Sequence, residues 1–285
     1  MWRGWRDVLG RLGFETAALD AKLLTGHALG LDALALATRE QEPASDEQVA
    51  RVAGLLQRRV SGESVARIIG EREFFGLPFN LNAATLEPRP DTELLVDMAI
   101  KALEQDGRLL DLGTGTGCIP IAVLVHRPDA WGVASDIAPD ALAMARQNAG
   151  RNGVLDRLEF ALGSWFDALD HIPTVRADAE GFDLITSNPP YIASEVIETL
   201  APEVRSFDPR LALDGGPDGL GPYRVIAAGA ARHLKPGGQV LVEIGHDQGE
   251  SVGALFAEHG LDEILVHKDL NGLDRVISAH HLRDK

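Results

Sequence analysis

Asn188, Pro189, Pro190 and Tyr191 directly follow an apolar run, residues 182–187, that is typical of a buried strand. The two prolines lack an N–H and cannot continue a strand ladder, so the segment presents hydrogen-bond acceptors and few donors. On its own, such a segment is either a tight structural turn or a pocket for a group that brings its own hydrogens.

A planar NH₂ group suits such a pocket. Its lone pair is delocalised into a carbonyl or a ring, so it reacts only when it is oriented toward an electrophilic carbon. The Asn188 side-chain oxygen can accept one hydrogen, the Pro189 carbonyl oxygen can accept the other, and Tyr191 can cover the planar face. Carbonyl oxygens also suit a cationic sulfonium and the positive charge that develops on nitrogen. The segment therefore favours methyl transfer to an NH₂ nitrogen.

A glycine loop lies upstream, between an apolar run and a helical pattern. Gly113, Gly115 and Gly117 permit positive φ and let the backbone approach a ligand closely. The spacing differs from the dinucleotide fingerprint, because Cys118 stands where its third glycine would be, and the lysine of a P-loop is absent. The loop is thus either a tight turn or a cofactor site.

Asp136 ends the next strand-like run. A carboxylate there commonly accepts the two hydroxyl hydrogens of a ribose; the alternative is the N-cap of the following helix, a role that Asp140 can also fill. Trp165, after the third run, either stacks on an adenine or anchors the core. The loop and Asp136 together favour an adenosine-containing ligand without a diphosphate, which S-adenosylmethionine fits.

The elements that carry these residues alternate between strand-like runs and helical patterns from residue 107 onward, which predicts an α/β fold with a largely parallel sheet. The expected strands are 108–112, 131–136, 158–162, 182–187, 239–244, 263–268 and 274–279. The connection between the last two is too short for a crossover helix, so they should form an antiparallel pair at one edge.

The N-terminal part, residues 1–72, reads as a small helical domain. Ser45 and Gln48 have the spacing of a capping box. The apolar residues that then recur on one helix face are Val49, Val52, Leu55, Leu56 and Val60. Residues 73–90 read as a linker with a short β-hairpin, and 91–285 as the catalytic domain.

The first helix of that catalytic domain begins near a proline-rich entry. Asp91 or Thr92 can cap it. Arg89, just before, is either a salt-bridge residue or a substrate contact. The segment 203–224 is long and glycine-rich without a strand pattern, which favours a functional loop beside the site.

The charge and composition of the chain limit the kinds of substrate, metal site and cellular location to expect. The net charge is −16, from 43 acidic and 27 basic residues, which disfavours a nucleic-acid substrate. No apolar stretch has the length of a membrane span, and the start lacks a secretory h-region. Cys118 is the single cysteine, and the scattered histidines predict no metal site. A cytoplasmic protein is expected.

Six segments resemble the bacterial release factor glutamine methyltransferases (the PrmC/HemK family): "EPRPDTELL", "DLGTGTGCI", "NPPYI", "LALDGGPDGLGPYR", "VEIGHDQG" and "DLNGLDRV". The resemblance implies a Rossmann-like, seven-stranded class I S-adenosylmethionine-dependent methyltransferase domain behind a helical substrate-recognition domain. It implies methylation of N5 of the glutamine in the Gly-Gly-Gln motif of class 1 peptide chain release factors, with S-adenosyl-L-methionine as cofactor. Glu87 and Asp208 depart from the family pattern, in which an apolar residue and a glutamate are expected.

The resemblance also implies site residues. Those implied to contact the cofactor are Gly113, Thr114, Gly115, Thr116, Gly117, Asp136, Trp165 and Asn188. Those implied to receive the substrate glutamine are Asn188, Pro189, Pro190 and Tyr191, with catalytic roles for Asn188, Pro189 and Tyr191.

Two other functions remain open at this point. An adenine-N6 nucleic-acid methyltransferase shares the Asn188–Tyr191 motif but would need a basic groove. A non-catalytic cofactor-binding protein that docks a translation partner would have no need to keep that motif intact.

Overall fold

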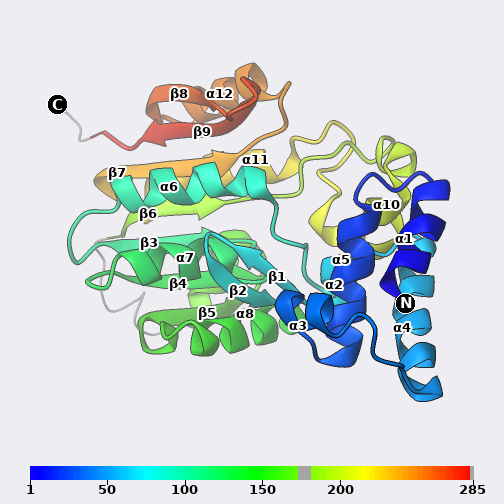
Figure 1. Ribbon diagram of the computed structural model, residues 1–285. Helices are drawn as coiled ribbons and strands as arrows, with labels where there is room; N and C mark the ends of the chain where they lie inside the picture. Colours follow the sequence, from blue (N-terminus) through cyan, green and yellow to red (C-terminus); the bar gives the residue numbers. More distant parts are fainter. Residues whose placement is uncertain (173–180, 283–285) are drawn as a thin grey trace. The chain divides into compact units, whose positions relative to one another are not determined.

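The computed structural model describes residues 1–172 and 181–282 (Figure 1). By their contacts the described residues form two units, one of Met1–Glu71 with Pro202–Phe207 and one of Arg72–Ala201 with Asp208–Lys285. The helices of the first unit are α1 (Trp2–Arg11), α2 (Ala17–Leu29), α3 (Ala33–Thr38), α4 (Asp46–Val60), α5 (Val65–Ile69) and α10 (Pro202–Phe207).

The helical unit has a small apolar core of its own, around Leu9, Leu24 and Leu56. The expected capping box is confirmed, since Ser45 and Gln48 each accept a hydrogen bond from the backbone N–H of the other. The predicted apolar face of α4 is wrong at its two outermost residues, Val49 and Val60.

Val49 and Val60 are 46% and 40% exposed, while the buried polar residue of α4 is Arg59. Its guanidinium pairs with Asp20 at 2.7 Å and with Glu203 of α10 at 2.6 Å. A buried arginine is tolerated because two carboxylates balance its charge, a pairing that helical periodicity cannot reveal.

The second unit contains the α/β fold. Its helices are α6 (Glu93–Ala102), α7 (Cys118–His126), α8 (Pro139–Arg151), α11 (Gly221–His233) and α12 (Gly249–Glu258). Its short 3₁₀ turns are η1 (Pro90–Thr92), η2 (Leu155–Arg157), η3 (Trp165–His171), η4 (Ile197–Thr199) and η5 (Arg210–Ala212). A separate hairpin of β1 (Glu71–Phe74) and β2 (Leu77–Asn80) turns at Phe75 and Gly76, both at positive φ.

The described part of the main sheet has seven strands in the order β5-β4-β3-β6-β7-β9-β8 (Figure 1). They are β3 (Arg108–Leu112), β4 (Trp131–Asp136), β5 (Leu158–Leu162), β6 (Phe182–Ser187), β7 (Leu234–Glu243), β8 (Asp262–Lys268) and β9 (Asp274–His280). β3 to β7 are parallel and β9 is antiparallel to both β7 and β8. The predicted α/β fold and the antiparallel edge pair are confirmed.

β7 begins earlier than the sequence indicated. Its pairing with β6 shifts between Phe182 and Leu184, so Leu234 pairs first and the regular register resumes only at Gln239. The irregular stretch between them contains Pro236 and two glycines, which conceal the strand pattern.

Alternate residues of the central strands serve opposite faces of the sheet. Leu109 and Leu184 pack in the core that includes residues of α6 and α7, while Leu110 and Ile185 pack in the core that includes residues of α11 and α12. Because both faces are covered, the central strands carry apolar residues on both faces, as expected for a parallel sheet.

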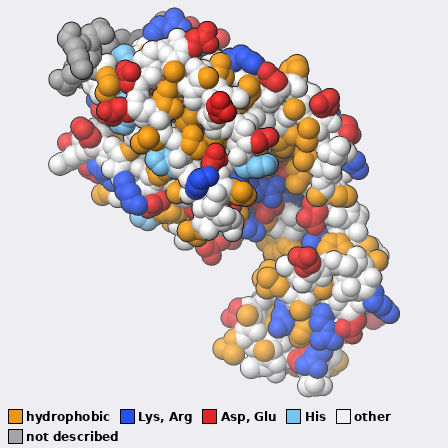
Figure 2. All heavy atoms as spheres, turned by 90° about the horizontal axis from the view of Figure 1, so that it is seen from above, with side chains coloured by type: hydrophobic (Ala, Val, Ile, Leu, Met, Phe, Trp, Pro, Cys, Tyr) orange, Lys and Arg blue, Asp and Glu red, His pale blue; other side chains and the backbone are white. Residues whose placement is uncertain are grey.

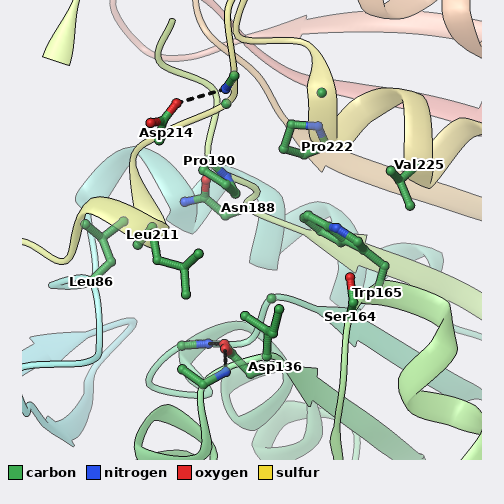
Figure 3. A pocket seen from close by; sticks show the side chains of 18 of the residues that line it. Leu86, Asp136, Ser164, Trp165, Asn188, Pro190, Leu211, Asp214, Pro222 and Val225 are labelled. Carbon is green, nitrogen blue, oxygen red and sulfur yellow. Dashed lines mark hydrogen bonds between the residues drawn. The ribbon is translucent and has the colours of Figure 1, made fainter. Parts of the chain in front are cut away.

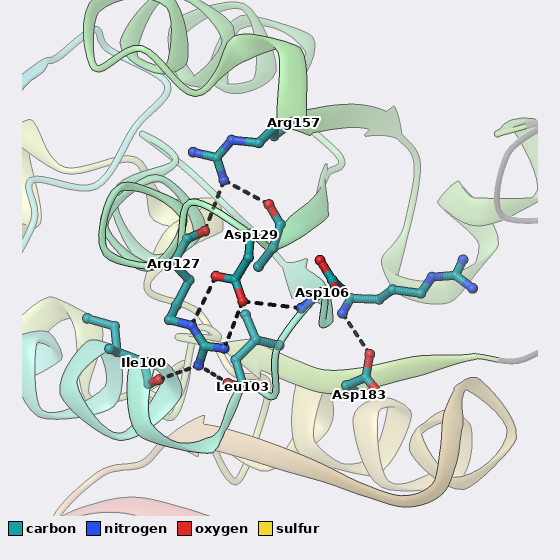
Figure 4. A network of polar contacts seen from close by, with 9 residues as sticks. Ile100, Leu103, Asp106, Arg127, Asp129, Arg157 and Asp183 are labelled. Carbon is teal, nitrogen blue, oxygen red and sulfur yellow. Dashed lines mark hydrogen bonds and ion pairs between the residues drawn. The ribbon is translucent and has the colours of Figure 1, made fainter.

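A polar network holds the loops at the amino ends of β3 and β4 (Figure 4). Arg127 donates to the carbonyl oxygens of Ile100 and Leu103, and its own carbonyl accepts from Arg157 at 3.0 Å. Asp129 accepts from the Asp106 N–H at 3.2 Å. The network thus holds the loops at the amino ends of the strands, whereas the glycine loop lies at their carboxyl ends.

In the described part of the chain, none of the helices combines the length and the apolar character that crossing a membrane requires.

Candidate active site

The carboxyl ends of β3, β4 and β6 meet at one edge of the sheet. Leu112 pairs in register with Ser135 and with Ser187, so the residues that follow these strands begin side by side. They line a cavity of about 400 Å³ (Figure 3). Other segments at the cavity are the start of η3, the loop 211–216 and the start of α11. Most of the exposed lining is apolar, with few polar groups, as small-molecule sites usually are.

The glycine loop adopts the expected positive-φ backbone. Gly113, Gly115 and Gly117 have φ of 70°, 56° and 78°. Gly113 and Gly115 line the cavity. Gly117 instead starts α7, where a Cβ would lie 2.8 Å from Ile121, so helix packing requires its missing side chain.

The two threonines of the loop turn away from the cavity. Thr114 and Thr116 are 5% and 2% exposed, and neither they nor Gly117 line the cavity. A cofactor contact from any of these three would involve the backbone, and that assignment stays a prediction.

Asp136 joins the end of β4 to the glycine loop. Its Oδ2 accepts from the Gly115 N–H at 2.8 Å and its Oδ1 from the Ala138 N–H at 2.9 Å. Neither Asp136 nor Asp140 caps α8, since Ala138 stands at the N-cap and no side chain caps this helix. Burial raises the pKa of Asp136. Each oxygen keeps acceptor capacity for a ligand hydroxyl, as the ribose hypothesis requires.

Trp165 lines the cavity from the first position of η3, beside Ser164 (Figure 3). Its φ is +48°, a left-handed conformation that costs energy for a bulky residue and indicates that surrounding structure holds it there. The ring is close to the glycine loop, because a Cβ on Gly113 would lie 4.0 Å from its Cζ3. A flat ligand in the cavity can therefore stack on the indole.

Replacement of Trp165 by alanine should raise the dissociation constant of S-adenosylhomocysteine about tenfold, because base–aromatic stacking is worth ~1–3 kcal/mol. Phenylalanine at this position should recover most of that loss. Isothermal titration calorimetry measures both values, and Trp2→Ala in the helical unit is the matched control. A wild-type dissociation constant for Trp165→Ala would leave the ring as a core anchor only.

The strand-ending motif contributes two residues to the cavity wall. Asn188 and Pro190 line it, whereas Pro189 is buried and Tyr191 lies elsewhere, partly buried. Burial raises the pKa of the Tyr191 phenol to about 12, so it stays protonated at neutral pH. The substrate roles of the Pro189 carbonyl and the Tyr191 ring remain predictions.

The glycine-rich loop packs directly on this motif. A Cβ on Gly219 would lie 2.5 Å from the Tyr191 carbonyl oxygen, and one on Gly215 would lie 2.9 Å from the Pro190 carbonyl oxygen. Gln248 joins the two segments, donating to the carbonyls of Tyr191 at 3.0 Å and Gly219 at 3.3 Å. Residues 211–222 therefore lie beside the site, as predicted for the segment 203–224, whereas residues 203–207 of that segment belong to helix α10 of the first unit.

Sequence reasoning missed several residues around the cavity. Leu86, Leu211 and Val225 supply apolar lining, and Gln248 holds the motif. Leu86 lies in a loop, Leu211 in η5 and Val225 on α11, and no local pattern distinguishes an apolar residue that lines a cavity from one that packs in a core. Arg89 pairs with Asp208 at 2.6 Å, which favours the salt-bridge alternative. No metal-binding cluster of His, Cys, Asp or Glu occurs among the described residues.

Two solved structures share the fold of this chain. A methyltransferase from Pyrococcus furiosus matches at 16% identity with a TM-score of 0.53, covering 81% of this chain and all of that one. The hMettl16 catalytic domain, solved with a MAT2A 3′UTR hairpin, matches at 14% identity with a TM-score of 0.58 over 84% and 82% of the chains. A family profile described as a methyltransferase domain matches residues 103–262. The fold and the cavity thus define a Rossmann-like methyltransferase.

Close relatives specify the family. A release factor glutamine methyltransferase of Agrobacterium fabrum is 44% identical over 96% of this chain and 93% of its own length. Another of Cereibacter sphaeroides is 45% identical over 95% and 94%. A profile described as the PrmC N-terminal domain matches residues 1–70. The chain belongs to the release factor glutamine methyltransferase family.

Proposed function

We propose that the protein transfers a methyl group from S-adenosyl-L-methionine to N5 of the glutamine in the Gly-Gly-Gln motif of class 1 peptide chain release factors. The observation that carries the proposal is that Asn188 lines the same cavity as Asp136 and Trp165. Groups suited to a nucleoside thus stand beside a group suited to a planar amide. Relatives named release factor glutamine methyltransferase match 96% and 95% of the chain.

The cavity fits the cofactor. Its volume of about 400 Å³ is in the range of small-molecule sites. The Asp136 carboxylate accepts ribose hydroxyls, Trp165 covers the adenine, and Gly113 and Gly115 admit the ligand close to the backbone. S-Adenosylmethionine supplies an electrophilic methyl group, whose bond to sulfur breaks as the new bond to nitrogen forms.

The chain's own residues prepare the amide for this step. Asn188 Oδ1 accepts one hydrogen of the substrate amide and the Pro189 carbonyl accepts the other, so that the lone pair is turned toward the methyl carbon. Both oxygens also stabilise the positive charge that grows on nitrogen. Tyr191 cannot act as a base with a pKa of about 12, so the proton leaves to water.

The helical unit is proposed to recognise the release factor, and 1–72, 73–90 and 91–285 are proposed as recognition domain, linker and methyltransferase domain. Because translation termination occurs in the cytoplasm, we also place the reaction there. A nucleic-acid substrate is not favoured: the net charge is −16, and acidic and basic side chains are interspersed on the face shown in Figure 2.

One labelling assay tests the proposed function. The protein is incubated with methyl-labelled S-adenosylmethionine and a class 1 release factor, the same factor with its Gly-Gly-Gln glutamine changed to alanine, or duplex DNA. Label is expected only in the unmodified factor. Label in DNA alone would establish the adenine alternative, and label in none of them would favour a cofactor-binding protein without transferase activity.

A further inference from the structure

The orientation of the Asn188 side chain decides whether it can serve the reaction. Its amide has an accepting end, Oδ1, and a donating end, Nδ2, of nearly the same shape. Only Oδ1 can accept a hydrogen from a substrate amide, and rotation by half a turn would present a competing donor. The protein therefore needs a contact that distinguishes the two ends.

Two buried residues supply that contact. Asn188 Nδ2 donates to Thr92 Oγ1 at 3.1 Å, and Thr92 Oγ1 donates to Glu243 Oε2 at 2.6 Å. Thr92 and Glu243 are each 2% exposed. Thr92 lies at the junction of η1 and α6, and Glu243 ends β7.

The Thr92 hydroxyl makes no hydrogen bond to a backbone N–H of α6, the helix that it precedes. The sequence predicted that Asp91 or Thr92 caps α6; Thr92 stands at the N-cap position, but its side chain makes no capping hydrogen bond. Asp91 instead pairs with Arg275 at 3.1 Å. The hydroxyl is thus available to link Glu243 to Asn188.

Hydrogen counting makes the chain of contacts directional. A hydroxyl has one hydrogen, and a carboxylate can only accept, so the Thr92 hydrogen goes to Glu243. The Thr92 oxygen then has only lone pairs to offer, and it selects the NH₂ end of Asn188. Oδ1 is left as the end of the amide available to the cavity.

Glu243 must be ionised for this direction to hold. Burial and, to a smaller extent, the charge of Asp91 raise its pKa to about 7, while Thr92, Arg275 and the side chain of Asn188 itself oppose that rise. At about pH 8 the carboxylate form predominates. Burying a carboxylate is costly, and the hydrogen bond to Thr92 offsets part of that cost.

We propose that Glu243, acting through Thr92, is a positioning pair that fixes the Asn188 amide with Oδ1 toward the substrate. The inference rests on the proposed function for its catalytic consequence. Thr92 lies in "EPRPDTELL" and Glu243 in "VEIGHDQG", two of the segments that resemble the family. The residues assigned to the cofactor and the substrate lie in other segments, so those assignments give these two segments no role.

Three variants distinguish the loss of the Thr92 hydrogen bond from a change in packing. Thr92→Val keeps the shape and removes the hydroxyl, whereas Thr92→Ser keeps the hydroxyl and removes a methyl group. In Glu243→Gln, the new NH₂ can donate to Thr92 and drive its hydrogen toward Asn188 Oδ1, reversing the orientation. Thr25→Val, at a buried threonine of the helical unit, is the control.

Turnover of a release factor at about pH 8 should fall about thirtyfold in kcat for Thr92→Val and Glu243→Gln, less than the ~10²–10³ for removal of a catalytic hydrogen-bonding group, because Asn188 itself remains. KM and the dissociation constant of S-adenosylhomocysteine should change less than about threefold. Thr92→Ser should retain kcat within about threefold. Equal losses in the valine and serine variants, or wild-type kcat in the valine variant, would overturn the inference.

A second measurement does not depend on the substrate. Hydrogen exchange of the Asn188 side-chain NH₂, followed by ¹⁵N-resolved NMR and assigned by its loss in Asn188→Ala, should be slow in wild type and Thr92→Ser. It should accelerate at least about fivefold in Thr92→Val, because a hydrogen bond worth about 1 kcal/mol is removed. Unchanged exchange in Thr92→Val would refute the positioning role. This test does not need turnover, so it holds even if the wild-type protein methylates no release factor. Absence of methylation would refute the proposed function, but not the positioning role.

Discussion

Replacement of Asn188 by alanine should reduce kcat about a thousandfold, equivalent to about 4 kcal/mol of barrier. The loss is expected because the substrate NH₂ would lose both the acceptor that orients it and the oxygen that stabilises its developing charge. The cavity should otherwise persist, since Asn188 is one of many residues that line it. Cofactor affinity should therefore fall less than about tenfold, far less than turnover.

Single-turnover rates with labelled S-adenosylmethionine and saturating release factor measure the first effect, and calorimetry with S-adenosylhomocysteine measures the second. Asn271→Ala, in the exposed turn between β8 and β9, is the matched control. If Asn188→Ala keeps its rate within tenfold of wild type, the acceptor role is wrong.

Replacement of Asp136 by alanine should raise the dissociation constant of S-adenosylhomocysteine about a hundredfold, or about 2.7 kcal/mol. Two effects combine. The variant removes the acceptors proposed for the ribose, and it also releases the N–H groups of Gly115 and Ala138 that the carboxylate now holds. Hydrogen bonds to a charged group are worth ~1.5–3 kcal/mol each, so this loss is within range.

Calorimetry on Asp136→Ala and on the control Asp140→Ala tests the assignment. Asp140 is exposed in the first turn of α8 and outside the cavity lining, so its variant should bind as wild type does. At saturating cofactor, kcat of Asp136→Ala should recover most of its value, since Asp136 acts in binding. A dissociation constant that does not change would exclude Asp136 as a ribose contact.

The strands were predictable because each is a short, mainly apolar run that is separated from the next by a helical or turn pattern. β3, β4 and β5 begin and end where the sequence indicated, and β7 differs where proline and glycines interrupt its pattern. Helix ends were less predictable. The capping box of α4 was correct. At α6 the N-cap position of Thr92 was correct, but its hydroxyl bonds to Glu243, far along the chain, and not to the helix.

The surface helix face was also only partly predictable. The spacing indicated Val49 and Val60 as core residues, yet both are exposed, and the polar side chain Arg59 is buried. Whether an arginine can be buried depends on carboxylates at Asp20 and Glu203 that come from other helices, and no local pattern records them.

The sequence by itself determined the local chemistry of this protein. Three glycines dictate a loop with positive φ, two prolines end a strand with free acceptors, and the alternating pattern orders a parallel sheet. These features depend on neighbouring residues or on simple periods, so they are visible along the chain. They sufficed to indicate the type of group that is methylated and the type of donor.

Only the tertiary structure decided how those pieces act together. It brings Asp136, Trp165 and Asn188 to one cavity while leaving Pro189 and Tyr191 outside its lining. It also connects Asn188 through Thr92 to Glu243. The physical reason is that strand register and helix packing set these distances, and both are sums over many weak contacts between residues far apart in sequence.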